Sequence, residues 1–291
     1  MLAVPAAARA QDIEPRAFSN APVGVNFLIG GYAFTRGGLS FDTAVPITNA
    51  HLNTSNAVLG YARVLDLWGN SAKFDAVLPV TWLSGTAQFA GQPVERTVDG
   101  LGDARFRLSV NFYGAPALTL KEFTEYQQDL ILGASFAVMA PTGQYDPARV
   151  VNLGTNRWSF KPELGASKAI GPLALELTAG ATFYTENTNF LRGRTRSQDP
   201  ITSIQGHAIY SFSRGIWASF DATYFAGGRT SIDGDLNNDL QKNWRLGATL
   251  AFPLSAHHSI KLFGSSGVSA RTGNNYDLIG IALQYRWGGG L

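Results

Sequence analysis

The sequence predicts an all-β protein: a transmembrane, antiparallel β-barrel of about twelve strands, of the bacterial outer-membrane type. Apolar and polar residues alternate over runs of about ten residues, the length that a tilted strand needs to cross a bilayer, whereas soluble strands average about five or six. Short and long connectors alternate between these runs. Charged residues make up only 15% of the 291 residues, against roughly 25% in soluble domains. Together these observations favour lipid contact over a soluble β-sandwich.

The first residues resemble the end of a secretory signal peptide. Residues 1–10 are small and mostly apolar, and the sequence "ARA" before Gln11 fits an A-x-A cleavage site. An alanine-rich, disordered N-terminus is the alternative interpretation. The expected organisation is a signal remnant at 1–10, a periplasmic N-terminal segment at 11–23 and a single barrel domain at 24–287. No run of 18 apolar residues occurs, so the sequence predicts no transmembrane helix.

The strands are predicted from period-2 alternation, which places successive side chains on opposite faces. In the last run, residues 279–287, Ile281 and Tyr285 share the apolar face, while Gln284 and Arg286 share the other. Clear alternation occurs at 72–82, 105–112, 130–138, 160–167, 173–183, 244–252 and 279–287. Weaker strands are expected at 24–34, 55–67, 201–212, 216–225 and 259–269.

The connectors predict two different ends of the barrel. Short joins such as "DLWGNS" and "FSRG" alternate with long polar segments, as expected when turns are tight on the periplasmic side and loops are long outside. Long loops are expected at about 35–54, 83–102, 141–157, 186–200 and 226–241. Segment 113–128 is long where a short turn is due, and segment 270–276 is short where a loop is due. Both termini are expected to be periplasmic.

Polar residues opposite the apolar faces are predicted to line the barrel interior, because a charge at the lipid midplane costs roughly 2–4 kcal/mol. The predicted pore-lining residues are Arg105, Arg107, Lys161, Glu163, Glu176, Gln205, His207, Asp221, Arg245, Gln284 and Arg286. Two interpretations remain open. These side chains contact solutes and set selectivity, or they pair across the lumen and make the barrel rigid.

Helical periodicity occurs in one segment, Pro116–Gln128. If this segment folds into the periplasmic mouth, Leu120, Phe123 and Tyr126 form a constriction. The alternative is an interfacial helix that lies on the membrane surface.

Several other classes of function find little support. The net charge of +2 argues against a nucleic-acid partner, and the absence of cysteine excludes thiolate chemistry. The loop Ser231–Asn243 lacks the glycine and the glutamate of a calcium loop, so a solvated loop without metal or cofactor is expected. No G-x-S-x-G or H-E-x-x-H motif occurs, which argues against an enzyme. A lipid hydrolase would need catalytic groups facing lipid, whereas His207 faces inward. A non-conducting structural or adhesion barrel remains an alternative.

Several phrases of the sequence carry a resemblance to a known family. They are Asp99–Asp103, Ala140–Pro147, Asn152–Ser167, Gly227–Gly234 and Ala282–Trp287. Across about residues 21–287, the chain resembles the outer-membrane channel family named for the meta-pathway of phenol degradation. This resemblance implies a barrel of about twelve strands for passive uptake of small hydrophobic or aromatic compounds.

The expected partners are membrane lipid, such solutes and the barrel-insertion machinery, which would bind the C-terminal strand of a monomer. One departure affects this last expectation. Many outer-membrane barrels end on an aromatic residue, whereas here Gly288–Leu291 follow Trp287.

Overall fold

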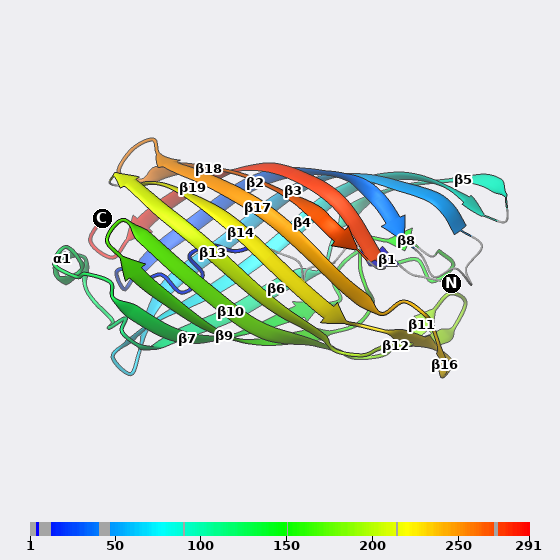
Figure 1. Cartoon of the computed structure of the whole chain (residues 1–291), viewed down its shortest axis with the longest axis horizontal. Helices are drawn as coiled ribbons and strands as arrows, with labels where there is room; N and C mark the ends of the chain where they lie inside the picture. Colours follow the sequence, from blue (N-terminus) through cyan, green and yellow to red (C-terminus); the bar gives the residue numbers. More distant parts are fainter. Residues whose placement is uncertain are drawn as a thin grey trace.

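The computed structural model describes residues 4–5, 13–40, 47–89, 91–149, 151–213, 215–270 and 273–291. Twelve strands form a closed antiparallel barrel in which each strand pairs with its neighbours along the chain (Figure 1). They are β2 (Val25–Ser40), β3 (Ile47–Leu67), β4 (Asn70–Phe89), β6 (Ala104–Tyr113), β7 (Leu130–Ala140), β9 (Ser159–Ile170), β10 (Leu173–Tyr184), β13 (Ile201–Ser213), β14 (Ile216–Gly227), β17 (Gln241–Pro253), β18 (His258–Ala270) and β19 (Gly273–Gly288). β19 pairs with β2 and closes the barrel. The predicted fold class is therefore confirmed.

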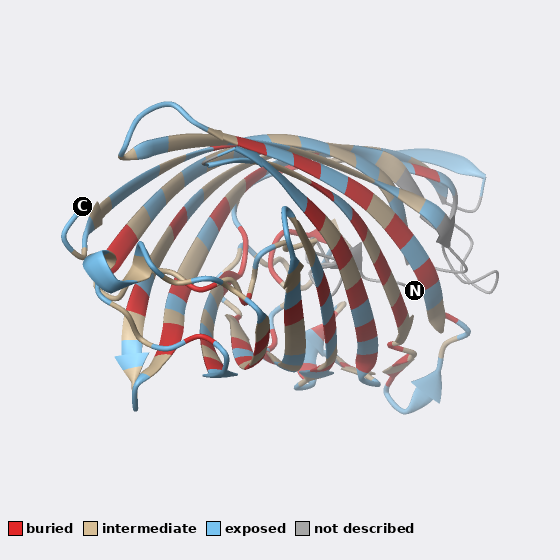
Figure 2. Cartoon of the chain, turned by 60° about the vertical axis from the view of Figure 1, so that its left-hand side comes forward, coloured by how far each residue is buried: buried red, intermediate tan, exposed pale blue. Residues whose placement is uncertain are grey.

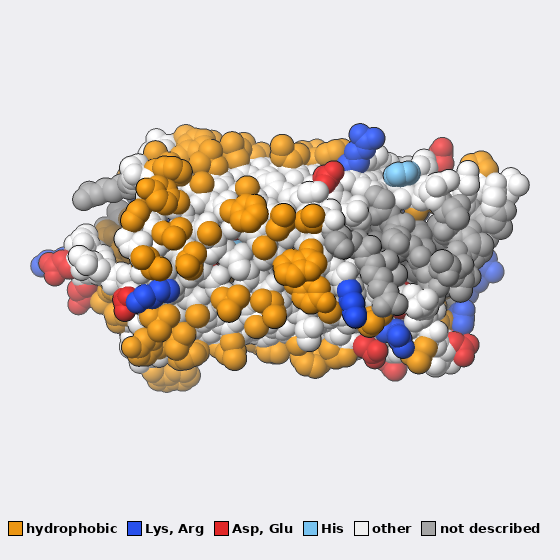
Figure 3. Space-filling model, in the orientation of Figure 1, with side chains coloured by type: hydrophobic (Ala, Val, Ile, Leu, Met, Phe, Trp, Pro, Cys, Tyr) orange, Lys and Arg blue, Asp and Glu red, His pale blue; other side chains and the backbone are white. Residues whose placement is uncertain are grey.

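The alternation in sequence becomes an outer and an inner face of the barrel wall. On β19, Ile279, Ile281 and Leu283 are 69%, 46% and 48% exposed on the outside, whereas Ala282 is 8% exposed on the inside. Apolar side chains cover the middle of the outer wall, and most of the charged side chains in view lie toward its ends (Figure 3). The buried residues appear as stripes along the barrel strands (Figure 2). This is the arrangement of a barrel that contacts lipid outside and polar groups inside.

The two ends of the barrel differ, as the connectors predict. At one end, β3 and β4 are joined by Trp68 and Gly69, whose φ angles of 54° and 79° are those that a two-residue hairpin turn needs. At the other end lie the hairpin of β4 with β5 (Gln92–Leu101) and a small sheet above the barrel. The strands of this sheet are β11 (Asn187–Phe190), β12 (Arg194–Gln198), β15 (Thr230–Ile232) and β16 (Asp235–Leu236).

Two of the predicted long loops are largely strand. Segment 83–102 forms the part of β4 at the long-loop end and all of β5, and most of segment 35–54 belongs to β2 and β3. Outside the part of the wall that contacts lipid, a strand still pairs with its neighbours through the backbone but no longer needs an apolar face. The alternation of apolar and polar residues therefore ends before the strand does. Residues 41–46, 90 and 271–272, which also fall in predicted connectors, lie outside the described residues.

The two ends of the chain meet different ends of the barrel. β1 (Val4–Pro5) pairs in parallel with β8 (Val151–Asn152), in the long connection between β7 and β9. The last strand ends at the short-turn end (Figure 1). The expectation that both termini are periplasmic stays a prediction. Apart from Val4 and Pro5, the predicted signal remnant lies outside the described residues.

Helix is scarce in the described part of the chain. Its α-helix, α1 (Leu120–Phe123), has 4 residues. Among the described residues, no helix has the length and apolar character needed to cross a membrane.

Candidate functional site

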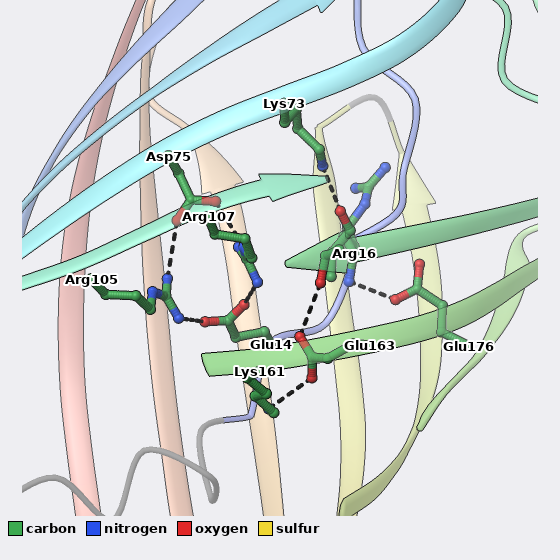
Figure 4. Close-up of polar contacts among 11 residues, drawn as sticks. Glu14, Arg16, Lys73, Asp75, Arg105, Arg107, Lys161, Glu163 and Glu176 are labelled. Atoms are coloured by element: carbon green, nitrogen blue, oxygen red, sulfur yellow. Dashed lines mark hydrogen bonds and ion pairs between the residues drawn. The ribbon is translucent and has the colours of Figure 1, made fainter. Parts of the chain in front are cut away.

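A charge cluster on the inner wall joins two barrel strands to the N-terminal segment. Asp75 on β4 lies opposite Arg107 on β6. Its carboxylate accepts hydrogen bonds from Arg107 Nε at 2.8 Å and from Arg105 Nη2 at 3.2 Å. Both arginines also form ion pairs with Glu14 (Figure 4). Two positive charges are therefore balanced by two carboxylates, one from the wall and one from the N-terminal segment.

Residues 13–20 of the N-terminal segment lie against the inner wall of the barrel. Three wall side chains bind its backbone: Lys73 Nζ donates to Ala17 O at 2.7 Å, Asn111 Nδ2 donates to Phe18 O at 2.9 Å, and Glu176 Oε2 accepts from Arg16 N at 2.7 Å. The sequence predicts a periplasmic N-terminal segment at residues 11–23. In the structure, residues 13–20 of this segment lie in the lumen, where Glu14 supplies a counter-charge for the arginines of β6.

Phe18 anchors the segment on a pair of glycines. Gly133 on β7 and Gly165 on β9 lie opposite each other. A Cβ atom at either position would come within 2.4 Å and 2.1 Å, respectively, of the Phe18 ring. Phe18 is only 2% exposed, and burial of such a ring contributes about 1.5–3 kcal/mol. The two glycines therefore form a recess that no larger residue would leave open.

Beside the segment, the lumen contains a cavity of about 40 Å³. Its lining includes Glu14, Phe18, Arg105, Lys161, Glu163 and Gln205. Lys161 Nζ and Glu163 Oε1 are paired at 2.7 Å. A cavity that holds benzene measures about 150 Å³, so this one admits a few water molecules and no aromatic solute. The N-terminal segment thus occupies the space that a solute would need.

Further along the wall, the predicted inward residues bind neighbouring groups of the wall. His207 Nδ1 lies 2.7 Å from Asp221 Oδ1, and Ser219 Oγ donates to Asp221 Oδ2 at 3.1 Å. Arg245 donates to Ser265 Oγ and to a backbone carbonyl, both at 2.8 Å. These contacts favour the interpretation in which wall charges make the barrel rigid. Among the described residues, no cluster of histidine and carboxylate ligands could hold a metal ion.

The end of β19 differs from the predicted pore wall. Gln284 is half-buried on the inner face, but Arg286 is exposed. Arg286 Nε donates to Ala256 O at 2.7 Å, in the turn between β17 and β18. Alternation on β19 continues as far as the rim of the barrel. Arg286 is therefore an inward position by pattern, but at the rim it contacts the β17–β18 turn and not the lumen.

The segment predicted as a constriction lies at the rim. None of the four residues of α1 is buried, and α1 projects from the short-turn end (Figure 1). The rings of Phe123 and Tyr126 stack at 5.6 Å, and Tyr126 OH donates to Gly114 O at 2.7 Å. A capping box between Thr119 and Glu122 begins the helix, and the hydrogen bond from the Thr119 N–H lowers the pKa of Glu122. Leu120, Phe123 and Tyr126 therefore do not line the lumen in this structure.

Residues 22–287 match the sequence model of a family described as "Putative MetA-pathway of phenol degradation". The chain belongs to this family. A comparison with curated proteins gives no match.

Two solved structures show the same fold as this family member. The COG4313 outer membrane channel from Pseudomonas putida F1 is similar with a TM-score of 0.80 and 20% identity, over 95% of this chain and 100% of that one. The transport unit of the autotransporter AIDA-I from Escherichia coli is similar with a TM-score of 0.53 and 8% identity, over 92% of each chain. At these identities the likeness concerns the fold.

Three of the five phrases that carry the family resemblance, Asp99–Asp103, Ala140–Pro147 and Asn152–Ser167, meet in one lock at the long-loop end. The carboxylate of Asp103 accepts hydrogen bonds from the N–H groups of Gly143 and Thr155, both at 2.9 Å, and from the Thr155 hydroxyl at 2.6 Å. A Cβ atom on Gly143 or on Gly154 would lie 2.6 Å from the backbone of the other. The lock fixes segment 141–157, whose Leu153 packs with Leu83 and Val98 of the β4–β5 hairpin.

Sequence reasoning missed several residues of this site. Lys73 and Asp75 stand on the polar face of run 72–82, so the rule that found Arg105 also applies to them. Glu14 and Phe18 lie outside any periodic run, and no sequence signal places them in the lumen.

Proposed function

We propose that the protein is a monomeric channel of the bacterial outer membrane for passive uptake of small hydrophobic or aromatic compounds. The observation that carries the proposal is a closed barrel with an apolar outer wall and a polar lumen that a segment of the same chain occupies. The family description and the likeness to an outer membrane channel support it. The substrate class rests on the family description.

The proposed route runs lengthwise through the barrel. The connections at 83–102, 141–157 and 226–241 form the outer entrance, and the short-turn end with α1 faces the periplasm, as in other outer-membrane barrels. Residues 13–20 leave the lumen to open it. This is feasible because side chains hold the segment, so its departure leaves the strand pairs of the barrel intact. Lipid contacts the outer wall, and β19 presents the strand that the insertion machinery would bind.

The inner histidine gives no support to a lipolytic alternative. Ser219 donates its hydrogen bond to Asp221 and not to His207, so the three residues do not form a serine–histidine relay. They also face the lumen, away from lipid.

Planar-bilayer recordings and solute uptake into liposomes test the proposal. The purified protein is expected to give discrete conductance steps and to admit phenol-sized aromatic compounds faster than sugars of larger size. Heat-denatured protein from the same preparation is the control. The absence of both conductance and solute entry would contradict the channel and favour a structural barrel. Growth of a deletion strain on aromatic carbon sources then tests the substrate class.

Replacement of residues 119–126 by a short Gly-Ser linker is expected to leave single-channel conductance unchanged. Because α1 packs at the rim and buries none of its residues, its removal does not widen the lumen. The measurement is the conductance histogram of the variant beside that of the full chain. A clear rise would show that α1 folds into the mouth in the membrane.

A further inference from the structure

Two arginines at the long-loop end form a site that the lumen cluster does not include. Arg157 lies in the connection before β9, and Arg196 lies on β12 of the small sheet. They are only 3% and 5% exposed. Arg157 bonds the side chain of Gln198, which lies two residues from Arg196 on β12, and burial and the charge of Arg196 both lower the pKa of Arg157. Two like charges are thus held close to each other and away from water.

These guanidinium groups have unused donors. Arg157 Nη2 donates to the side-chain oxygen of Gln198, but its Nε and Nη1 are buried without a hydrogen-bond partner. Nε of Arg196 is buried in the same way. Among the residues that the structure describes, neither arginine takes part in an ion pair. A guanidinium group stays protonated in proteins, so it cannot escape this situation by losing its charge.

The acids whose charges reach these arginines are bonded to other groups. Asp103 binds the backbone of segment 141–157 through the lock described above. Asp239 accepts hydrogen bonds from the N–H of Thr230 at 2.9 Å and from its hydroxyl at 2.7 Å. These carboxylates offset the charges of the arginines but accept none of their free N–H groups, and a buried donor without an acceptor is unfavourable. The site therefore lacks hydrogen-bond acceptors and is suited to a bound group that supplies them.

Aromatic rings flank both charges. The Arg157 guanidinium lies 4.4 Å from the centroid of the Tyr184 ring, and that of Arg196 lies 5.8 Å from the Phe190 ring. Tyr184 ends β10, two residues after Thr182, which lines the lumen cavity. The site thus combines planar donors for an anion with the partly exposed ring of Tyr184 for an apolar body, on the side of the cavity toward the long-loop end.

We propose that Arg157 and Arg196 bind the carboxylate of a small aromatic acid as it enters the barrel. A carboxylate presents two oxygens that match the paired N–H groups of a guanidinium, and the ring of the solute contacts Tyr184, whose side chain is partly exposed. The inference rests on the proposed channel and names its substrate class more closely: aromatic compounds that carry an anionic carboxyl group.

Calorimetric titration of the detergent-solubilised full chain tests this site without relying on conductance. Benzoate is the probe, with benzamide as its neutral counterpart, acetate as a carboxylate without a ring, and inorganic phosphate as a different anion. Benzoate is expected to bind at least about tenfold more tightly than benzamide, because a hydrogen bond to a charged group is worth more than one to a neutral group. It is also expected to bind at least about tenfold more tightly than acetate or phosphate, because neither carries a ring that can contact Tyr184.

Three glutamine variants locate the binding. Arg157→Gln and Arg196→Gln are each expected to weaken benzoate binding about tenfold or more. Arg194→Gln is the matched control, because Arg194 lies on the same strand but pairs with Asp233 at 2.6 Å; this variant is expected to bind as the unchanged chain does. Heat-modifiable migration on gels confirms that each barrel is folded. If Arg157→Gln does not fold, Arg196→Gln decides.

Several outcomes would overturn the inference. They are equal binding of benzoate and benzamide, unchanged benzoate binding in the folded arginine variants, or phosphate binding as tight as that of benzoate. Conductance is recorded on the same preparations. Loss of benzoate binding in a conducting protein would overturn this site and leave the channel, whereas binding without conductance would overturn the channel and leave the site.

Discussion

Deletion of residues 13–20 is expected to raise the single-channel conductance several-fold. In the structure this segment holds Glu14 against Arg105 and Arg107 and leaves a cavity of about 40 Å³ beside it. The deletion removes the obstruction and frees two arginines, so selectivity is also expected to shift toward anions. Planar-bilayer recordings under a salt gradient measure both quantities. An unchanged conductance would mean that the segment does not occupy the conducting path.

A milder variant, Glu14→Gln, keeps residues 13–20 in the chain but weakens their hold on the wall, so it distinguishes displacement of the segment from its deletion. The substitution removes the charge that pairs with Arg105 and Arg107 in this partly buried cluster, so the substituted segment is expected to leave the lumen more often and to produce longer open periods. Glu125→Gln is the matched control, because Glu125 is exposed in the rim segment after α1. Identical gating of the two variants would contradict the role assigned to Glu14.

Asp103→Ala is expected to destabilise the long-loop end by about 3–5 kcal/mol. The change leaves two partly buried N–H groups and one hydroxyl without their acceptor, and a hydrogen bond to a charged group contributes about 1.5–3 kcal/mol. Because these bonds fix segment 141–157, cleavage by trypsin at Arg149 is expected to become faster. The measurements are denaturant unfolding followed by tryptophan fluorescence and the rate of limited proteolysis.

Asp99→Ala is the matched control for the lock. Asp99 belongs to the same sequence phrase as Asp103 but is exposed, so its removal is expected to leave both measurements unchanged. Equal protease sensitivity of the two variants would show that the lock does not hold the segment.

The strands were predictable because lipid imposes a simple rule on the sequence. Each outward residue must be apolar, so β19 shows its two faces over its whole membrane span. Where a strand extends beyond the membrane, its outward residues no longer need to be apolar. The β4–β5 hairpin continues with residues such as Glu95 and Arg96, and periodicity alone gives a polar loop there. Strand pairing outside the membrane depends on contacts between backbones, which the apolar pattern does not record.

Only those residues of the site that belong to the strands of the barrel wall could be predicted from the sequence. The inward position of Arg105 and Arg107 follows from alternation, because a charged side chain that faced lipid would destabilise the barrel. Their partner Glu14 lies 91 and 93 residues earlier in the chain. Nothing local in the sequence shows that a short polar segment returns into the lumen, and Phe18 fits its recess through two glycines on neighbouring strands. Such contacts depend on the closed shape of the barrel.

The closure of β19 on β2 has a consequence for the order of assembly. The segment at 13–20 directly precedes β2, yet it is surrounded by strands made later, including β7 and β9. The ring cannot close until its final strand has been synthesised. The earliest part of the described domain is therefore among the last to gain its full set of neighbours, and it must either wait inside the open sheet or thread into the finished ring from one end.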